Sequence, residues 1–153
     1  MKIDFGVIFH GWIPHGEIQK ILKGCDFTIL PSIREFGGGV VIESLAMGLP
    51  AIVADYAGPA ELVDSSRGIR VPFTDESSLI NGLQAAIERF AENPAQLEPL
   101  GSSGRAFVEA NLTWDAKAGQ IMKVYEAVLN GKFDPSELQI FPIPERSVVV
   151  ERN

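Results

Sequence analysis

The sequence is poor in cysteine and histidine. Cys25 is the single cysteine, so no internal disulfide can form, and the chain suits a reducing compartment. We interpret Cys25, which ends a helical pattern beside Phe27, as a small core residue rather than a nucleophile. His10 and His15 lack the i,i+4 helical spacing and the third ligand of a zinc site. The sequence therefore predicts no metal site, and we interpret His15 as an exposed residue at the start of a helix.

Long apolar runs and an excess of basic charge are also missing. No run reaches the 18 or more apolar residues of a membrane-spanning helix. The first ten residues lack the basic and apolar regions of a signal peptide, so we expect a cytoplasmic protein. Twenty acidic residues against 13 basic ones, a net charge of −7, argue against a nucleic-acid partner. A small phosphorylated ligand is not excluded, because helix-end dipoles can hold one on an acidic protein.

The chain does contain enough apolar sequence for one folded domain. Of its 153 residues, 46% are hydrophobic and 22% charged. Four short apolar runs are nearly continuous, as in parallel strands covered on both faces, and they recur roughly every twenty residues, as strand–helix–strand crossovers do. The sequence therefore predicts an α/β fold with a parallel sheet. The predicted strands are Val7–His10, Phe27–Leu30, Ala51–Ala54 and Ile69–Val71.

Helical periodicity and capping signals predict the helices. They are expected over Gly16–Lys23, over Gly39–Met47 with a stop at Gly48, from about Thr74-Asp75-Glu76 to Asn93, over Pro94–Asn111, and from Thr113 onward.

The last predicted helix carries an apolar stripe that includes Trp114, Ile121 and Tyr125. We interpret this stripe as a face packed on its own domain, with a partner-binding face as the alternative. Residues 131–153 are predicted as a tail, in which Val148–Val150 could add an edge strand. The tail could instead wrap the domain or be partly disordered.

Residues 31–43 form the stretch most informative about chemistry. A predicted strand ends at Leu30, a loop follows, and Gly37, Gly38 and Gly39 lead into a helix. Ligands of open parallel sheets bind outside the carboxyl ends of the strands. Glycines let a ligand approach the peptide N–H groups closely, and a helix N-terminus favours an anion. The pattern predicts a phosphate site.

Two acidic residues flank this glycine stretch. Glu35 precedes it and Glu43 lies just over one turn into the helix, so we expect both carboxylates to face one pocket. Carboxylates accept hydrogen bonds from adjacent hydroxyls, which suits a sugar or a ribose. The alternative is a glycine turn with two solvated acids, since this triplet is neither a Walker loop nor a G-x-G-x-x-G motif.

Glu35 and Glu43 form an E-x7-E motif, preceded by Pro31-Ser32 and followed by residues 44–53 (SLAMGLPAIV). This arrangement resembles the donor-site motif of retaining GT-B glycosyltransferases of family four, the glycosyl transferases group 1. The resemblance covers about residues 5–129. Further matching segments in the family's order are Phe9–Ile13, Gly58–Val63, Gly68–Pro72 and Leu112–Trp114.

The resemblance implies that residues 1–130 are the C-terminal, donor-binding domain of a GT-B enzyme. Such a domain is Rossmann-like, with a three-layer parallel sheet flanked by helices. The implied substrate is a nucleoside-diphosphate sugar, transferred to a hydroxyl acceptor with its anomeric configuration retained, and no cofactor is implied.

The family's roles can be carried over to matching residues. The resemblance places Glu35 beside the donor sugar near the reacting centre. It assigns backbone N–H contacts with the sugar and diphosphate to Phe36, Gly37, Gly38 and Gly39. Glu43 is expected to bind the ribose hydroxyls. The segment Gly11-Trp12-Ile13 is expected near the base.

The sequence departs from the family on its N-terminal side. The 153 residues hold no segment that resembles the family's acceptor domain, and no arginine and lysine stand where the family clamps the diphosphate. We therefore expect a donor domain truncated on that side, with the acceptor domain supplied in cis or in trans, and no useful transfer by the chain alone. A fragment, a natural truncation and a subunit of a split enzyme all fit.

Two other functions remain open from the sequence. One is a non-catalytic interaction module that self-associates through the truncated sheet edge. The other is a nucleotide-sugar epimerase, which shares the two-domain fold but matches these motifs less well.

Overall fold

A parallel sheet of three strands forms the centre of the chain. The computed structural model describes residues 6–131. Its strands are β1 (Thr28–Leu30), β2 (Ala51–Ala54) and β3 (Gly68–Val71), in the spatial order β1-β2-β3. Both neighbouring pairs are parallel, with Ile29 opposite Ile52 and Ile52 opposite Ile69. The three predicted strands at these positions are confirmed.

Helices precede, connect and follow the strands, and they confirm the α/β alternation. The helix starting at Glu76 has the polar cap that the sequence predicts: the Asp75 carboxylate accepts from the Ser78 N–H at 2.8 Å, and the Ser78 hydroxyl accepts from the Asp75 N–H at 3.1 Å. The helices are α1 (His15–Leu22), α2 (Gly39–Ala46), α3 (Ala57–Leu62), α4 (Glu76–Glu92), the 3-10 turn η1 (Pro94–Gln96), α5 (Leu97–Asn111) and α6 (Trp114–Leu129).

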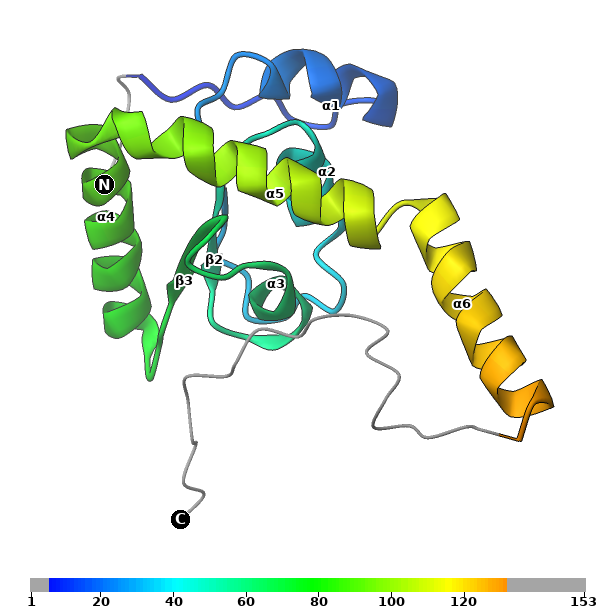
Figure 1. Ribbon diagram of the computed structural model, residues 1–153. Coiled ribbons are helices and arrows are strands. Elements are labelled where there is room, and N and C mark those ends of the chain that lie inside the picture. Colours follow the sequence, from blue (N-terminus) through cyan, green and yellow to red (C-terminus); the bar gives the residue numbers. More distant parts are fainter. Residues whose placement is uncertain (1–5, 132–153) are drawn as a thin grey trace.

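The sheet is covered on both faces, which makes three layers (Figure 1). Alternate residues of β2 face opposite sides: Ala51 and Val53 pack among residues of α2, α3 and α5, whereas Ile52 packs among residues of β3 and α4. All four residues of β2 are buried, which explains why its sequence is an uninterrupted apolar run. The three-layer arrangement confirms the predicted fold class.

Helix α3 was not anticipated from the sequence. Gly58 and Pro59 look like helix breakers, but Pro59 occupies the first turn of α3, where a missing N–H costs no helical hydrogen bond. The short helix places Leu62 and Val63 in the core beside α2.

The predicted strand Val7–His10 is wrong. These residues form no strand, and the side chains of Ile8 and Phe9 are 77% and 88% exposed. The segment runs beside α1, away from the sheet (Figure 1). An apolar run becomes a strand only where a neighbouring strand pairs with it, and the sheet of the described residues pairs β1, β2 and β3 alone.

The interpretation of Cys25 as a core residue is also wrong. Helix α1 ends at Leu22, and the turn at Gly24 leaves Cys25 exposed, with its Sγ 3.5 Å from the Ile21 carbonyl oxygen. Leu22 is buried and Phe27 packs edge-on against Phe90, so these two residues take the interior positions on either side of Cys25.

Helix α6 extends away from the three layers (Figure 1), so the interpretation of its stripe as a face packed on this domain is wrong. None of its residues is buried. The first half of α6 is attached to α5, where the Gln120 side chain donates to the Asn111 carbonyl at 3.2 Å. Within residues 6–131 nothing covers the apolar stripe. Its exposed members are Trp114, Ile121, Met122, Tyr125, Val128 and Leu129.

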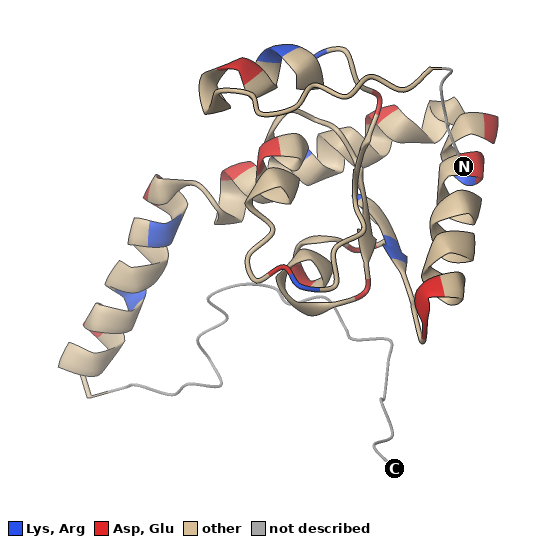
Figure 2. Ribbon diagram, turned by 180° about the vertical axis from the view of Figure 1, so that it is seen from behind, with Lys and Arg blue, Asp and Glu red and all other residues tan. Residues whose placement is uncertain are grey.

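Charged residues are spread over several elements (Figure 2). In that view the Lys and Arg positions of the described residues lie on several elements, among acidic positions. Across residues 6–131, no helix combines the length and apolarity needed to cross a bilayer. The predicted tail beyond residue 131, including Val148–Val150, lies outside the described residues.

Candidate functional site

The loop of residues 31–38 links the carboxyl end of β1 to the start of α2. Gly38, the residue before α2, has a left-handed conformation with φ of +63°. A Cβ at Gly38 would lie 3.2 Å from the Pro59 Cγ and 3.3 Å from the Leu62 Cδ1. Both its backbone conformation and the closeness of α3 therefore require glycine here. The loop consequently rests directly on α3.

Gly58 brings the backbone of α3 against the same loop. A Cβ at Gly58 would overlap the carbonyl oxygen of Phe36. The preceding residue, Ala57, has a φ of +48°, which is unusual for a residue with a side chain. Such strained backbone persists only where its surroundings fix it, and it occurs often in functional sites.

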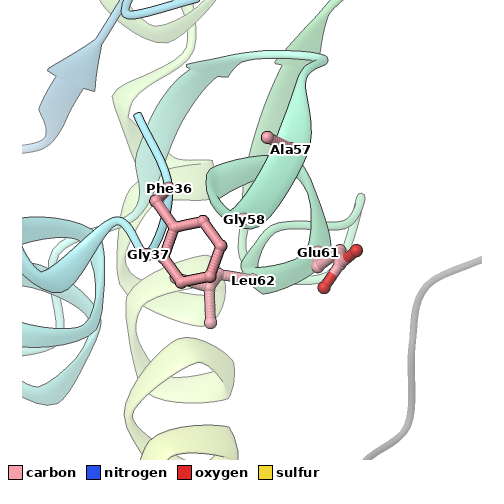
Figure 3. A pocket seen from close by; sticks show the side chains of 6 residues that line it. All are labelled: Phe36, Gly37, Ala57, Gly58, Glu61 and Leu62. Atoms are coloured by element: carbon pink, nitrogen blue, oxygen red, sulfur yellow. The ribbon is translucent and has the colours of Figure 1, made fainter. Parts of the chain in front are cut away.

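A pocket of about 390 Å³ opens between the loop and α3. Figure 3 shows Phe36 on the loop side facing the α3 residues, with the Glu61 carboxylate directed away from the aromatic ring. The Phe36 side chain is 95% exposed, so it is available to a bound molecule. The residues that line the pocket are Phe36, Gly37, Ala57, Gly58, Glu61 and Leu62.

The carboxylate of Glu35 is held by the loop itself. Its Oε1 accepts hydrogen bonds from the N–H groups of Gly37 and Gly38, both at 3.1 Å. These bonds, that from Gly38 above all, hold the pKa of the Glu35 carboxyl below its ordinary value, because they stabilise the charged form. The Glu35 carboxylate is therefore the hydrogen-bond acceptor of the Gly37 and Gly38 amides, two of the amides that the sequence analysis assigns to a ligand.

The start of α2 supplies two more amides. Within residues 6–131 the N–H groups of Gly39 and Val40 have no acceptor, as expected for the first turn of a helix. A Cβ at Gly37 or Gly39 would meet no atom within 4 Å, so these two glycines border open space. The combination of free N–H groups, a helix N-terminus and open space suits an anion.

Glu43 lies on α2 and points toward α1. Its Oε1 is 2.9 Å from the Nε2 of His15, the first residue of α1. The two side chains are 42% and 80% exposed. The residues that line this pocket include neither Glu35 nor Glu43. The two carboxylates have different hydrogen-bond donors, and that both face one bound ligand stays a prediction.

The other residues singled out in the sequence lie as follows. Gly11 and Trp12 are exposed, Ile13 is partly buried, and the three lead into α1 just before His15. As expected, His15 is an exposed residue at a helix start. Among residues 6–131 no group of three or more metal-binding side chains is present.

Sequence reasoning missed His15 and the α3 side of the pocket. His15 gave no signal, because its contact with Glu43 joins residues 28 positions apart. Gly58 did give a signal for the α3 side of the pocket, because a glycine soon after a strand end often marks a close approach of two backbone segments.

We expect the Glu35 carboxyl to titrate below the ordinary pKa of a glutamate. Since the folded-state pKa lies below the unfolded one, the contribution of this carboxylate to loop stability is complete above the unfolded pKa and lost as the pH falls through the folded pKa. NMR titration of the Gly37 and Gly38 amides should show this midpoint, and Glu35→Gln should abolish it. A midpoint at or above the ordinary value contradicts the hydrogen bonding described.

Comparison with known proteins identifies related sequences. The family model described as glycosyl transferases group 1 matches residues 2–107. A glycogen synthase of Mycobacterium tuberculosis is 27% identical over 128 residues, which cover 83% of this chain and 30% of that protein. A D-inositol 3-phosphate glycosyltransferase of Streptomyces bingchenggensis is 30% identical over 116 residues, which cover 75% of this chain and 24% of that protein.

A solved structure shares the fold. The sucrose-phosphate synthase from Thermosynechococcus elongatus superposes with a TM-score of 0.67 at 30% sequence identity, covering 81% of this chain and 30% of that one. The chain thus spans less than a third of the length of each of these proteins.

Proposed function

The chain belongs to the glycosyl transferases group 1, and from this premise we propose that it forms the donor-binding part of a retaining glycosyltransferase. The donor is a nucleoside-diphosphate sugar and the acceptor a hydroxyl group. The observation that carries the proposal is a set of four amides at the start of α2. The N–H groups of Gly39 and Val40 have no acceptor within residues 6–131, and those of Gly37 and Gly38 donate to the Glu35 carboxylate, which a phosphate can replace as acceptor.

The diphosphate binds at this set of amides. The N–H groups of Gly39 and Val40 donate hydrogen bonds directly to its oxygens, aided by the dipole of α2. The diphosphate also competes with the Glu35 carboxylate for the N–H groups of Gly37 and Gly38. Donors already in place stabilise the charge that develops on the leaving diphosphate.

The sugar lies beside Glu35 and the pocket. Once the diphosphate displaces it from the loop amides, the Glu35 carboxylate accepts hydrogen bonds from sugar hydroxyls near the reacting centre. Phe36 and the start of α3 border the same space, where Phe36 offers an exposed ring. We assign no nucleophilic role to Glu35.

The nucleoside binds on the α1 side. Glu43 accepts from the ribose hydroxyls, and the segment Gly11-Trp12-Ile13 adjoins the base. Support for placing the nucleoside on the α1 side comes from His15, which lies two residues after Ile13 in the sequence and contacts Glu43. The exposed indole of Trp12 provides a stacking surface there.

Isothermal titration calorimetry with UDP, GDP and ADP tests the proposal. We expect one of them to bind the 153-residue chain, and Glu43→Gln to weaken that binding about tenfold, because a hydrogen bond to a charged acceptor is lost. Glu109→Gln is the control: it neutralises a comparable exposed acid on α5, to which no part in donor binding is assigned, and it should leave the nucleotide affinity unchanged. Absence of binding by all three nucleotides sinks the proposal.

We further propose that transfer needs a second, acceptor-binding domain, supplied in cis or in trans. Support comes from the share of the relatives that the chain covers and from the exposure of the site residues. The purified 153-residue chain should therefore release no more sugar from a donor than buffer does, because it cannot position an acceptor. Measured transfer to a hydroxyl acceptor by this chain alone contradicts the requirement.

One observation favours a second function, a non-catalytic interaction module. Within residues 6–131, strand β1 lies at an edge of the sheet, and its Ile29 is 40% exposed. An open edge presents unpaired backbone groups that a second copy of the chain can pair with. Analytical ultracentrifugation separates the two: self-association without nucleotide binding supports the module, whereas a monomer that binds nucleotide supports the donor site.

A further inference from the structure

His15 and Glu43 connect two helices that otherwise have little to hold them together. In the part of the chain that the structure describes, their contact is the one side-chain hydrogen bond between α1 and another element. Leu22, at the opposite end of the helix, is the single buried residue of α1, and Ile18 and Ile21 are partly buried. His15 therefore gives the first turn of α1 its side-chain hydrogen bond to α2.

The chemistry of the contact fixes which atom donates. An ionised carboxylate only accepts hydrogen bonds, so the Nε2 of His15 carries the proton that lies between the two groups. This contact uses the Oε1 of Glu43. Within residues 6–131 no other side chain forms a hydrogen bond or ion pair with the carboxylate, so its Oε2 keeps its capacity as an acceptor.

We propose that His15 is a positioning residue for nucleotide binding: it orients Glu43 so that Oε2 accepts from the ribose hydroxyls, and it holds the start of α1 against α2. This role rests on the proposed function of Glu43. It gives the site a preference for ribonucleotides over 2′-deoxyribonucleotides, and it makes that preference depend on a residue outside the E-x7-E motif.

A competing role for His15 has the opposite consequence. If the imidazole blocked Glu43, its removal would free the carboxylate and tighten binding. If His15 merely stabilised α1, its removal would weaken ribonucleotides and 2′-deoxyribonucleotides equally. Loss of a positioning residue weakens binding of the ribonucleotide more than that of the 2′-deoxy compound, because the 2′-deoxy compound keeps only the 3′ hydroxyl of the two that the oriented carboxylate binds.

The test is calorimetry on the 153-residue chain with whichever of UDP, GDP and ADP binds best, together with its 2′-deoxy counterpart. We expect His15→Ala to weaken binding of the ribonucleotide about fivefold and to weaken binding of the 2′-deoxy compound by a clearly smaller factor. His15→Gln, whose amide can still donate to Glu43, should restore part of the loss. Lys20→Ala serves as the control on α1, because Lys20 bonds to Glu17 of the same helix.

The outcomes separate the two proposals. In a background of Glu43→Gln, His15→Ala should cause no further loss of affinity. Unchanged or tighter binding by His15→Ala, or equal losses for both nucleotides, overturns the role of His15 while Glu43→Gln still upholds the donor site. If Glu43→Gln itself binds like the wild type, the assignment of Glu43 fails and the role of His15 fails with it.

Discussion

Gly39→Ala is expected to weaken binding of the nucleoside diphosphate at least about tenfold without harming the fold. Gly39 is the first residue of α2, and a Cβ there would meet no atom within 4 Å. Alanine is favoured over glycine in helices by roughly 0.5–1 kcal/mol, so the folded state accommodates it. The same Cβ would stand in the open space through which the ligand reaches the N–H groups of Gly39 and Val40.

The control for this change is Gly119→Ala. Gly119 lies on the exposed helix α6, where a Cβ also meets no atom within 4 Å. Both variants should keep or slightly raise the free energy of unfolding, and only Gly39→Ala should lose affinity in calorimetry. Equal affinity in the two variants means that the diphosphate does not approach this face of α2.

Gly101→Ala is expected to lower the free energy of unfolding by about 3 kcal/mol. Gly101 is buried on α5, and its Cβ would overlap the carbonyl oxygen of Gly48, in the turn that ends α2. Three residues further along, Gly104 approaches the Leu45 side chain of α2 in the same way. At these two positions α5 lies too close to the end of α2 for a side chain to fit.

Urea denaturation followed by circular dichroism measures this effect, again with Gly119→Ala as the matched substitution. Because backbone atoms on both sides define the contact, neither helix can relieve the overlap by a rotamer change. An unfolding free energy equal to that of the wild type shows that α5 and α2 pack less closely than described.

The elements that could be predicted from the sequence are those with local signals. Strand β2 is a buried run, and its bounds agree with the prediction at both ends. The cap at Asp75 and the left-handed Gly48, with φ of +78°, fix the ends of α4 and α2 through chemistry confined to a few residues. Burial and capping are readable without knowledge of the rest of the fold.

The errors share one cause, which is that they depend on what lies next to a segment. An apolar run at Val7–His10 has the composition of a strand but no strand beside it. The stripe of α6 has the periodicity of a packed helix but no described surface against it. Cys25 follows a helix whose last turn points it outward. Periodicity shows which side of an element is apolar and not what covers that side.

The candidate site was predicted in its parts rather than in its contacts. The sequence placed the glycines, the helix start and the two glutamates of residues 35–43 at a strand end, where the structure has them. The hydrogen bonds of Glu35 to Gly37 and Gly38 and of Glu43 to His15 depend on side-chain directions that spacing does not encode.

The most direct test of the account is an amide NMR titration of the 153-residue chain with the nucleoside diphosphate that binds it. We predict the largest shifts at the N–H groups of Gly39 and Val40, with those of Gly37 and Gly38 changing as their carboxylate acceptor is exchanged for phosphate. Shifts confined to α4 or α6, with the amides of residues 37–40 unmoved, contradict the proposal that the start of α2 holds the diphosphate.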